Sequence, residues 1–129
     1  MKNFGLSRNE RIKSKNEFDL VFSKGKVVYS SGLLLKAKYL LLEGNGFKVA
    51  FTIHKKAGKA FWRNRARRLM KDIFRVNKAT ISTCCSEKQL LIVFSLNLIN
   101  QKKFPHLEYN FIKPELIDIL NKLQKELVN

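Results

Sequence analysis

The distribution of hydrophobic and polar residues predicts a first helix over residues 14–24. Ser14 and Glu17 match a capping box, in which the hydroxyl and the carboxylate satisfy unpaired amides of the first turn reciprocally. Gly25 suits the left-handed position that often follows a helix. Between these signals, apolar residues recur at helical spacing: Phe18, Val21 and Phe22. The start signal, the spacing and the stop signal thus agree on one helix.

Alternating residues then predict extended segments between residues 26 and 54. Residues 26–30 are expected to form a short edge strand. Residues 33–42 place one apolar set on the same face of a strand: Leu33, Leu35, Ala37, Tyr39 and Leu41. After a turn at residues 43–46, a strand over 47–54 repeats the pattern with Phe47, Val49, Phe51 and Ile53. Two successive strands thus share an apolar face and a polar, basic face, the latter carrying Lys36, Lys38, Lys48, Thr52 and His54.

Two helices and a buried strand are predicted in the second half of the chain. The helix over 59–77 has apolar residues within an arc of about 120°: Trp62, Ala66, Leu69, Met70, Ile73 and Val76. Phe61 and Phe74 lie outside this arc. Residues 90–96 form a buried strand in this interpretation. A last helix over 114–127 begins at Pro114, a residue favoured in the first turn. The order α-β-β-β-α-β-α over 129 residues predicts one α+β domain.

Charge narrows the function of such a domain. The sequence has 26 Lys and Arg against 10 Asp and Glu, a net charge of +16, and 45% hydrophobic residues. A small domain with this excess repels itself unless a polyanion accompanies it, which favours nucleic acid or an anionic membrane surface as the partner. The basic residues concentrate in two ranges, 1–26 and 55–75. The first of these ranges begins with residues 1–13, a segment expected to be basic and mobile. The slightly acidic segment 104–129 is expected to act as scaffold.

Several classes of function are not expected from this composition. No apolar run reaches the roughly 18 residues of a membrane-spanning helix, and the first residues lack a signal peptide's apolar stretch. A cytoplasmic location without a membrane partner is therefore expected. Cys84 and Cys85 are adjacent and cannot join distant segments, and they have no zinc-like spacing to a histidine, so no metal site is expected. The scattered acidic residues form no cluster for phosphodiester hydrolysis, so no residue is predicted to be catalytic.

The polar side of the helix over 59–77 favours nucleic acid. Its residues cluster within about 100° of arc: Asn64, Arg67, Arg68, Lys71 and Arg75. A solvated face is the ordinary interpretation of a charge run, but such a face usually alternates in sign. Here like charges lie four residues apart and repel, which favours a polyanionic partner, and arginine favours bidentate contacts with phosphate. Asn64 either contacts a base edge or a ribose hydroxyl, or orients a neighbouring backbone group.

Two motifs of the sequence occur together. The first reads Lys55-Lys56-Ala57-Gly58-Lys59-Ala60-Phe61-Trp62-Arg63-Asn64-Arg65-Ala66-Arg67-Arg68-Leu69. The second reads Phe18-x-x-Val21-Phe22-x-x-Gly25. Both motifs, and the distance between them, resemble those of a known family, the bacterial ribonuclease P protein subunit. The resemblance covers residues 8–75, and the later strand and helix agree with it in order but not in motif.

The resemblance implies a mixed sheet of the ribosomal protein S5 domain 2-like type. Its βαβ crossover is implied to be left-handed, although right-handed crossovers are the rule in other proteins. The implied function is that of a protein monomer that binds the catalytic RNA of ribonuclease P, forming a heterodimeric ribonucleoprotein. That RNA, with Mg²⁺ bound chiefly by the RNA itself, removes the 5′ leader from precursor tRNA. The protein is implied to bind the leader in a cleft, to assist substrate and metal binding, and to hold no cofactor tightly.

Carried onto matching positions, the resemblance assigns two sets of binding residues. Contacts to the RNA subunit are expected from Lys55, Lys56, Lys59, Arg63, Asn64, Arg65, Arg67, Arg68 and Lys71. The leader cleft is expected at Phe18, Phe22, Leu34, Lys36, Thr52 and His54. An ordinary core contact is the alternative for both phenylalanines. Phe22 is the less secure of the two as a leader contact, because it lies close to Val21 and Gly25.

The sequence departs from the family pattern at three places. His54 stands where the family usually has a small hydroxyl residue, and Ser95-Leu96 stands where it commonly has an arginine. The connection from Ser95 to Pro114 is longer than the family leads us to expect, so Phe104–Phe111 is predicted to be an extra surface element. A small basic ribosomal or DNA-binding protein is the alternative function that the charge allows, but it does not explain the two motifs.

Overall fold

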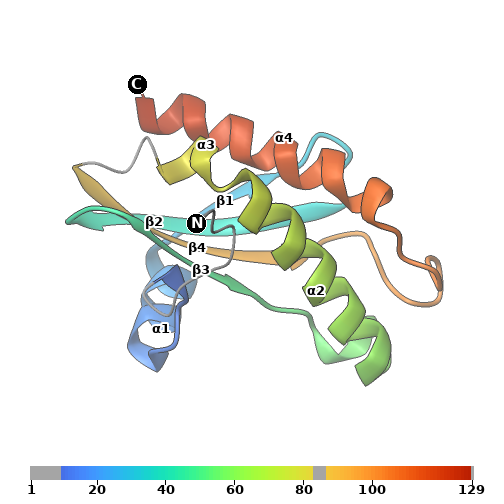
Figure 1. The fold of residues 1–129 in the computed structure, drawn as a ribbon. Helices are drawn as coiled ribbons and strands as arrows, with labels where there is room; N and C mark the ends of the chain where they lie inside the picture. Colours follow the sequence, from blue (N-terminus) through green and yellow to red (C-terminus); the bar gives the residue numbers. More distant parts are fainter. Residues whose placement is uncertain (1–9, 83–86, 129) are drawn as a thin grey trace, which may run out of the picture.

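The computed structural model describes residues 10–82 and 87–128, so the expectations for residues 1–9, Cys84 and Cys85 lie outside it. Within this described part, no helix is both long and apolar enough to cross a membrane. The elements in chain order are α1 (Lys15–Lys24), β1 (Lys26–Tyr29), β2 (Leu35–Glu43), β3 (Phe47–Phe51), the 3₁₀ turn η2 (Lys55–Ala57), α2 (Ala60–Asn77), α3 (Ala79–Ser82), β4 (Lys88–Leu96) and α4 (Tyr109–Val128). The sheet separates α1 on one face from α2, α3 and α4 on the other (Figure 1).

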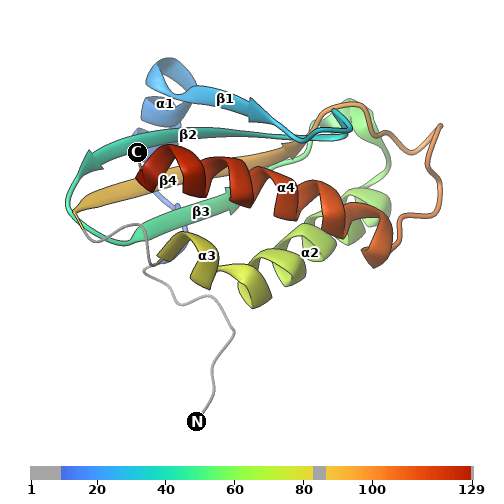
Figure 2. The same cartoon turned by 90° about the horizontal axis from the view of Figure 1, so that it is seen from above.

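The four strands form one mixed sheet in the order β1-β2-β4-β3. β4 is antiparallel to β2 and parallel to β3, so it separates the two strands that precede it in the sequence. The chain therefore leaves β3, crosses one face of the sheet as α2 and returns in β4. When the helices lie in front of the sheet and β3 and β4 point upward, β4 lies to the left of β3, so the crossover is left-handed (Figure 2). The α+β class and this crossover agree with the expectation from the sequence.

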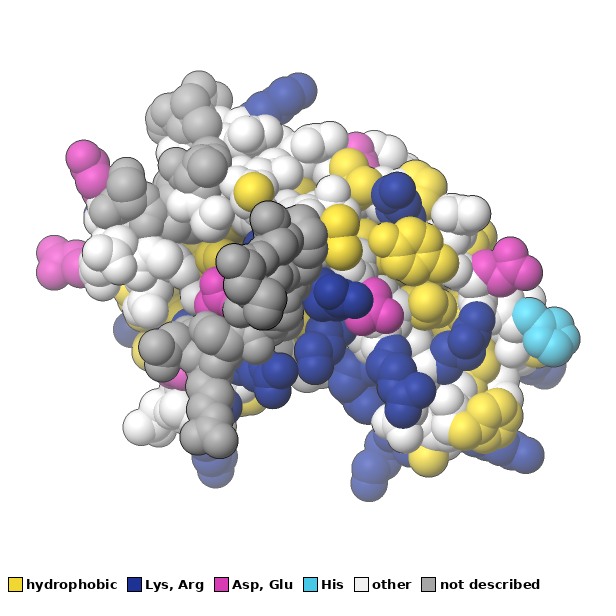
Figure 3. Space-filling model, viewed as in Figure 1, with side chains coloured by type: hydrophobic (Ala, Val, Ile, Leu, Met, Phe, Trp, Pro, Cys, Tyr) yellow, Lys and Arg dark blue, Asp and Glu magenta, His cyan; other side chains and the backbone are white. Residues whose placement is uncertain are grey.

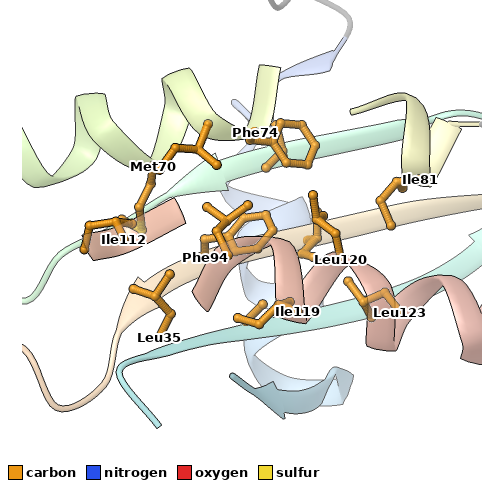
Figure 4. Close-up of a cluster of buried hydrophobic side chains, with 14 of the residues drawn as sticks. Leu35, Met70, Phe74, Ile81, Phe94, Ile112, Ile119, Leu120 and Leu123 are labelled. Atoms are coloured by element: carbon orange, nitrogen blue, oxygen red, sulfur yellow. The ribbon is translucent and has the colours of Figure 1, made fainter. Parts of the chain in front are cut away.

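The main core lies between the sheet and the helices α2, α3 and α4. Figure 4 shows Phe94 of β4 lying between side chains of α2 and α4. The Phe74 ring of α2 contacts three rings of the sheet, with centroid distances of 5.5 Å to Phe47, 5.9 Å to Phe51 and 5.6 Å to Phe94. Aromatic pairs at such distances add to the stabilisation that comes from burial. This contact anchors the second half of α2 on the sheet.

A second, smaller cluster lies on the opposite face of the sheet, beneath α1. Val21 of α1 packs there with Leu91 and Val93 of β4, all three nearly or fully buried. β4 is therefore apolar on both faces, as its unbroken run of hydrophobic residues indicates. Ile12 joins this cluster, and its amide donates to the Val49 carbonyl oxygen at 3.0 Å. The end of the segment expected to be mobile thus pairs with the outer edge of β3.

Two predicted apolar faces are partly wrong. Phe74, placed outside the apolar arc of α2, is fully buried, whereas Val76 is 48% exposed. The buried face of α2 is rotated toward Phe74, because that ring fills the space above three phenylalanines of the sheet. Leu33 precedes β2 in a turn, where its φ of 62° is left-handed, and it is exposed. Leu41 is also exposed, near the end of β2.

The predicted helix boundaries hold for α1 and α2, but the signals at Gly25 and Pro114 act differently from the prediction. Gly25 is extended, with φ −74°, and a Cβ there would lie 2.4 Å from the Val21 carbonyl oxygen. Glycine is thus required by close approach and not by a left-handed conformation. α4 begins at Tyr109, upstream of Pro114, because Ile112 is fully buried in the core and extends the helix backwards.

The connection between β4 and α4 is not the predicted surface element over Phe104–Phe111. Leu107 is buried, and the Phe104 and Phe111 rings lie 5.1 Å apart, partly buried against the main core. The last residues of that range belong to α4. Hydrophobic side chains therefore hold this connection against the domain.

The two phenylalanines outside the predicted arc of α2 provide a matched test of this packing. We expect Phe74→Ala to lower the free energy of unfolding by about 3–5 kcal/mol, because it empties a fully buried site. Phe61→Ala on the same helix should change it by less than about 0.5 kcal/mol, since that ring is 68% exposed. Urea denaturation monitored by circular dichroism measures both values. Equal losses would contradict the orientation of α2.

Candidate nucleic-acid interface

A groove of about 390 Å³ lies on the face of the sheet that α1 only partly covers. Alternate residues of neighbouring strands reach this face, as the pairs Tyr29–Lys36 and Lys38–Val93 show. α1 covers the apolar end of the face, where the second cluster lies, and leaves the other end open. The groove is lined by Phe22, Val27, Tyr29, Lys36, Lys38, Thr52, Ile53, His54, Val93, Ser95 and Leu96.

Lys38 ties the end of α1 to this groove. Its Nζ donates to the Phe22 carbonyl oxygen at 2.9 Å and lies 5.7 Å from the centroid of the Phe22 ring. The ammonium group therefore holds one face of the ring by a cation–π contact. The Phe22 side chain is 48% exposed, so the ring presents a flat apolar surface beside two lysines, Lys36 and Lys38. Cationic grooves with such aromatic surfaces are typical of sites for single-stranded nucleic acid.

The structure separates the two phenylalanines of the first helix. Their rings are stacked, with centroids 6.2 Å apart and planes inclined by 13°. Phe18 is partly buried against the second cluster, whereas Phe22 lines the groove. This is the reverse of the order expected from the sequence. A helical spacing of four residues places both rings on one side of α1 but does not tell which of them lies over the sheet's apolar end.

Three other predicted cleft residues, Lys36, Thr52 and His54, line the groove, but Leu34 does not. Leu34 is partly buried against the main core, and its carbonyl oxygen accepts from the Asn97 amide at 2.8 Å. It precedes β2, where the alternation of the strand does not yet apply. His54 has a further role: its Nδ1 accepts from the Lys56 amide at 3.1 Å and caps η2.

The sequence did not reveal the contribution of β1 to the groove. Val27 and Tyr29 lie two residues apart on this edge strand and are 41% and 42% exposed. Their spacing of two indicates that Val27 and Tyr29 share one face of an edge strand, but it does not indicate that this face lines a groove. Ser95, which departs from the family pattern, lies opposite Lys36 in the sheet and lines the groove.

The second cationic surface is the exposed side of α2 together with the residues that lead into it. Figure 3 shows Lys and Arg side chains gathered over this part of the molecule. Three arginines of the motif are oriented by bonds within the protein: Arg63 Nε donates to the Gly58 carbonyl oxygen at 3.0 Å, Arg65 Nε to that of Leu107 at 2.9 Å, and Arg67 Nη1 to Asn64 Oδ1 at 2.7 Å. Each bond uses one of the five N–H groups of a guanidinium, which leaves four for phosphate.

These bonds decide the role of Asn64 in the free protein. Its side chain orients the guanidinium of Arg67, one turn further along α2, and not a backbone group. Arg75, at the other end of the helix, forms an ion pair with Asp72 at 3.2 Å. The remaining predicted contacts keep their positive charge on or near the surface of this region: Lys55, Lys56, Lys59, Arg68 and Lys71. In the part of the chain that the structure describes, the ion pair of Arg75 with Asp72 offsets the predicted like-charge repulsion toward the C-terminal end of α2.

The two surfaces meet where the chain passes from β3 to η2. His54 lines the groove, and the next residue, Lys55, begins the cationic surface of α2. Among the described residues, no three His, Cys, Asp or Glu side chains come together in a group that could hold a metal ion. The lysines and arginines of the two surfaces supply binding groups for a polyanion.

Together these features define a class: small α+β proteins with a left-handed crossover that present a cationic groove and an arginine-bearing helix to nucleic acid. The model of the Ribonuclease P family matches residues 6–124. The ribonuclease P protein component of Desulfosudis oleivorans is 28% identical, over 95% of this chain and 93% of its own length. That of Porphyromonas gingivalis is 30% identical, over 77% and 74%. The chain belongs to the ribonuclease P protein family, the protein components of an endoribonuclease that processes tRNA.

Solved structures show the same fold. The ribonuclease P protein of Thermotoga maritima matches with a TM-score of 0.71 at 23% identity, covering 88% of this chain and 96% of that one. The Staphylococcus aureus protein matches with a TM-score of 0.67 at 22% identity, covering 92% of each chain. The solved structures support the fold. The family model and the relatives support the family suggested by the two motifs over the alternative of a ribosomal or DNA-binding protein.

Neutralising the middle of the α2 surface tests whether it contacts RNA. We expect the double variant Arg67→Gln, Lys71→Gln to bind the ribonuclease P RNA more weakly and to flatten the log–log salt dependence by about 0.7–0.9 for each phosphate that is no longer bound. The matched control, Lys113→Gln with Lys125→Gln, removes the same charge from α4. Filter binding over a salt series measures both slopes. An unchanged slope in the α2 variant would mean that these side chains face solvent.

Proposed function

We propose that this protein binds the 5′ leader of precursor tRNA in its groove while α2 and the residues before it bind the catalytic RNA of ribonuclease P. One observation carries the proposal: the groove and the arginine-bearing helix are separate cationic surfaces that meet at His54 and Lys55. A protein with both surfaces can hold a substrate strand beside a structured RNA. The catalytic RNA then cleaves the bond at the mature 5′ end.

The leader suits the groove because it is single-stranded. Lys36 and Lys38 supply charge for its phosphates, and the exposed Phe22 ring supplies a surface on which a base stacks. Thr52 and Ser95 add hydroxyl groups on the floor, which donate or accept hydrogen bonds. Stacking and phosphate contacts tolerate any base sequence, which supports a role in broadening the range of substrates.

The catalytic RNA suits the α2 surface because a structured RNA presents phosphates in a fixed arrangement. Guanidinium groups already oriented by Gly58, Leu107 and Asn64 lose less freedom on binding than freely rotating ones. The other cationic residues that share this surface with them extend the contact along the helix. We propose the RNA-subunit contacts at all nine positions predicted from the sequence.

Further features of the proposal concern the metal, the assembly and the compartment. The carboxylates and histidines of the described residues do not form a metal-binding group, so we propose that Mg²⁺ is bound chiefly by the RNA. The assembly is a heterodimer of one protein monomer and one RNA, in the cytoplasm. By holding the leader, the protein keeps the scissile phosphate close to the metal sites of the RNA.

The protein without its RNA should not cleave precursor tRNA, because its described residues offer no acid–base pair or metal cluster to activate water. Gel assays with 5′-labelled precursor tRNA and Mg²⁺, with and without the catalytic RNA, test this expectation. Adding the RNA should produce a single 5′ leader fragment. Site-specific cleavage by RNA-free protein would assign the chemistry to the protein instead.

Phe22 should matter only for substrates that carry a leader. Phe22→Ala should weaken binding of precursor tRNA with a leader of several nucleotides by about 1–3 kcal/mol in the assembled enzyme. Binding of a substrate with a one-nucleotide leader, and of mature tRNA, should stay the same. Phe18→Ala should instead lower the stability of the domain, since that ring is packed against the second cluster.

The control for this measurement is Phe61→Ala, which removes an exposed ring outside the groove. It should leave the discrimination between long and short leaders unchanged. If Phe22→Ala weakens binding of long, short and absent leaders by the same factor, the groove is not the leader site.

A further inference from the structure

The segment between β4 and α4, residues 97–108, runs beside the start of α2 and is called the 97–108 loop below (Figure 1). The backbone amide of Gln101 donates to the Ala57 carbonyl oxygen at 2.7 Å. The side-chain Oε1 of Gln101 accepts from the Lys59 amide, also at 2.7 Å. Gln101 thus joins the loop to η2 and to the residue that precedes α2.

The loop approaches this region so closely that only glycine fits at position 58. A Cβ on Gly58 would lie 2.7 Å from Trp62 Cε3 and 2.8 Å from the Cβ of Gln101. Further along the loop, Trp62 Nε1 donates to the Phe104 carbonyl oxygen at 2.9 Å. With the bond from Arg65 to Leu107, the contacts extend over two turns of α2. The loop therefore has a fixed position relative to the arginines of the motif.

A bay of about 550 Å³ lies between the loop and η2. Its lining, all within the described part of the chain, contains four lysines and no acidic residue: Lys55, Lys56, Ala57, Gly58, Lys59, Asn100, Gln101 and Lys102. The exposed Lys103 is adjacent in sequence, and its amide donates to Asn100 Oδ1 at 2.9 Å. Lysines gathered around one hollow repel each other, and phosphate groups between them would relieve that repulsion.

We propose that the 97–108 loop is a second RNA-contact element of this protein. In this proposal Lys102 and Lys103 bind backbone phosphates of the catalytic RNA, across the bay from Lys55 and Lys56. Gln101 is a positioning residue, because it fixes the loop against α2 without itself carrying charge. The proposal rests on the proposed function, and it adds a contact outside the two motifs.

The occupant is the catalytic RNA and not the leader. The bay shares Lys55, Lys56 and Lys59 with the surface assigned to the catalytic RNA, whereas none of its lining residues lines the groove. The bonds from Gln101, Phe104 and Leu107 also hold the loop to η2 and α2, and not to the groove. An RNA lying on the α2 surface therefore meets the loop without entering the groove.

The first experiment neutralises the loop with the double variant Lys102→Gln, Lys103→Gln. Its affinity for the catalytic RNA should fall, and the log–log salt dependence should flatten by about 0.7–0.9 for each phosphate that is no longer bound. The control variant Lys113→Gln, Lys125→Gln removes the same net charge from α4 and should keep the wild-type slope. Hydroxyl-radical footprinting should show nucleotides protected by wild type and by the control but not by the loop variant.

The second experiment separates charge from position at Gln101. Gln101→Glu keeps an oxygen that accepts from the Lys59 amide but places a negative charge in the bay. It should preserve thermal stability and weaken RNA binding. Gln101→Met removes the acceptor without adding charge, so it should raise hydrogen exchange at the Lys59 amide and also weaken RNA binding. Wild-type affinity of the Glu variant would mean that no phosphate of the catalytic RNA lies in the bay beside Gln101, and it would overturn the loop proposal.

The outcomes distinguish this proposal from the proposed function. If the loop variant binds like the control while Arg67→Gln, Lys71→Gln still weakens binding, the loop proposal is overturned and the function stands. If the loop variant loses affinity only for substrates with long leaders, the occupant is the leader and the proposal is wrong. If wild-type protein does not bind the catalytic RNA, the proposed function fails and the loop proposal fails with it.

Discussion

The strand β4 runs through the middle of the sheet with apolar side chains on both faces, and the positions of α1 and α2 follow from this. On one face Phe94 belongs to the core that fixes α2 and α4; on the other, Leu91 and Val93 meet Val21 of α1. Specific packing on each face fixes the register of this strand, because a shift of one residue would turn the Phe94 ring to the α1 side and away from Phe51 and Phe74. Once α1, α2 and α4 cover these apolar surfaces, the open end of the groove and the polar side of α2 stay exposed to solvent.

Several positive side chains of this protein are held in place by uncharged groups and not by acidic residues. Ion pairs exist, as between Lys48 and Glu17, but the arginines at the start of α2 donate mainly to carbonyl and amide oxygens. Such acceptors orient a guanidinium without cancelling its charge. The positive electrostatic potential around α2 therefore remains available to attract a polyanion. Lys38 is held in a similar way by a carbonyl oxygen and a ring. The positive groups are therefore positioned in advance by partners that do not compete electrostatically with phosphate.

Local features of this fold were predictable from the sequence, whereas features set by distant contacts were not. Ser14 caps α1, and the apolar run over 90–96 indicated a buried strand, which the structure shows to be covered on both faces. The insertion of β4 between β2 and β3 depends on pairings between distant residues, which periodicity does not report. For the same reason the groove residues Lys36 and Thr52 followed from strand alternation, but Val27 and Tyr29 did not, since their neighbours across the sheet were unknown. The 97–108 loop has neither periodicity nor a motif, and its place is set by the bonds of Gln101 and Phe104.

The central place of β4 also has a consequence for synthesis on the ribosome. In the described part of the chain, β3 pairs with β4 and, through a single bridge at Val49, with the segment before α1, so its main partner is missing until α2 and α3 have been made and β4 follows them. During this interval the nascent chain carries a strand without its main partner, and the apolar face of α2 has not yet met the side chains of β4. Pairing between segments so far apart in sequence is slow compared with helix formation. The many lysines and arginines repel one another along the emerging chain, and this repulsion opposes association with other nascent chains before β4 has been made.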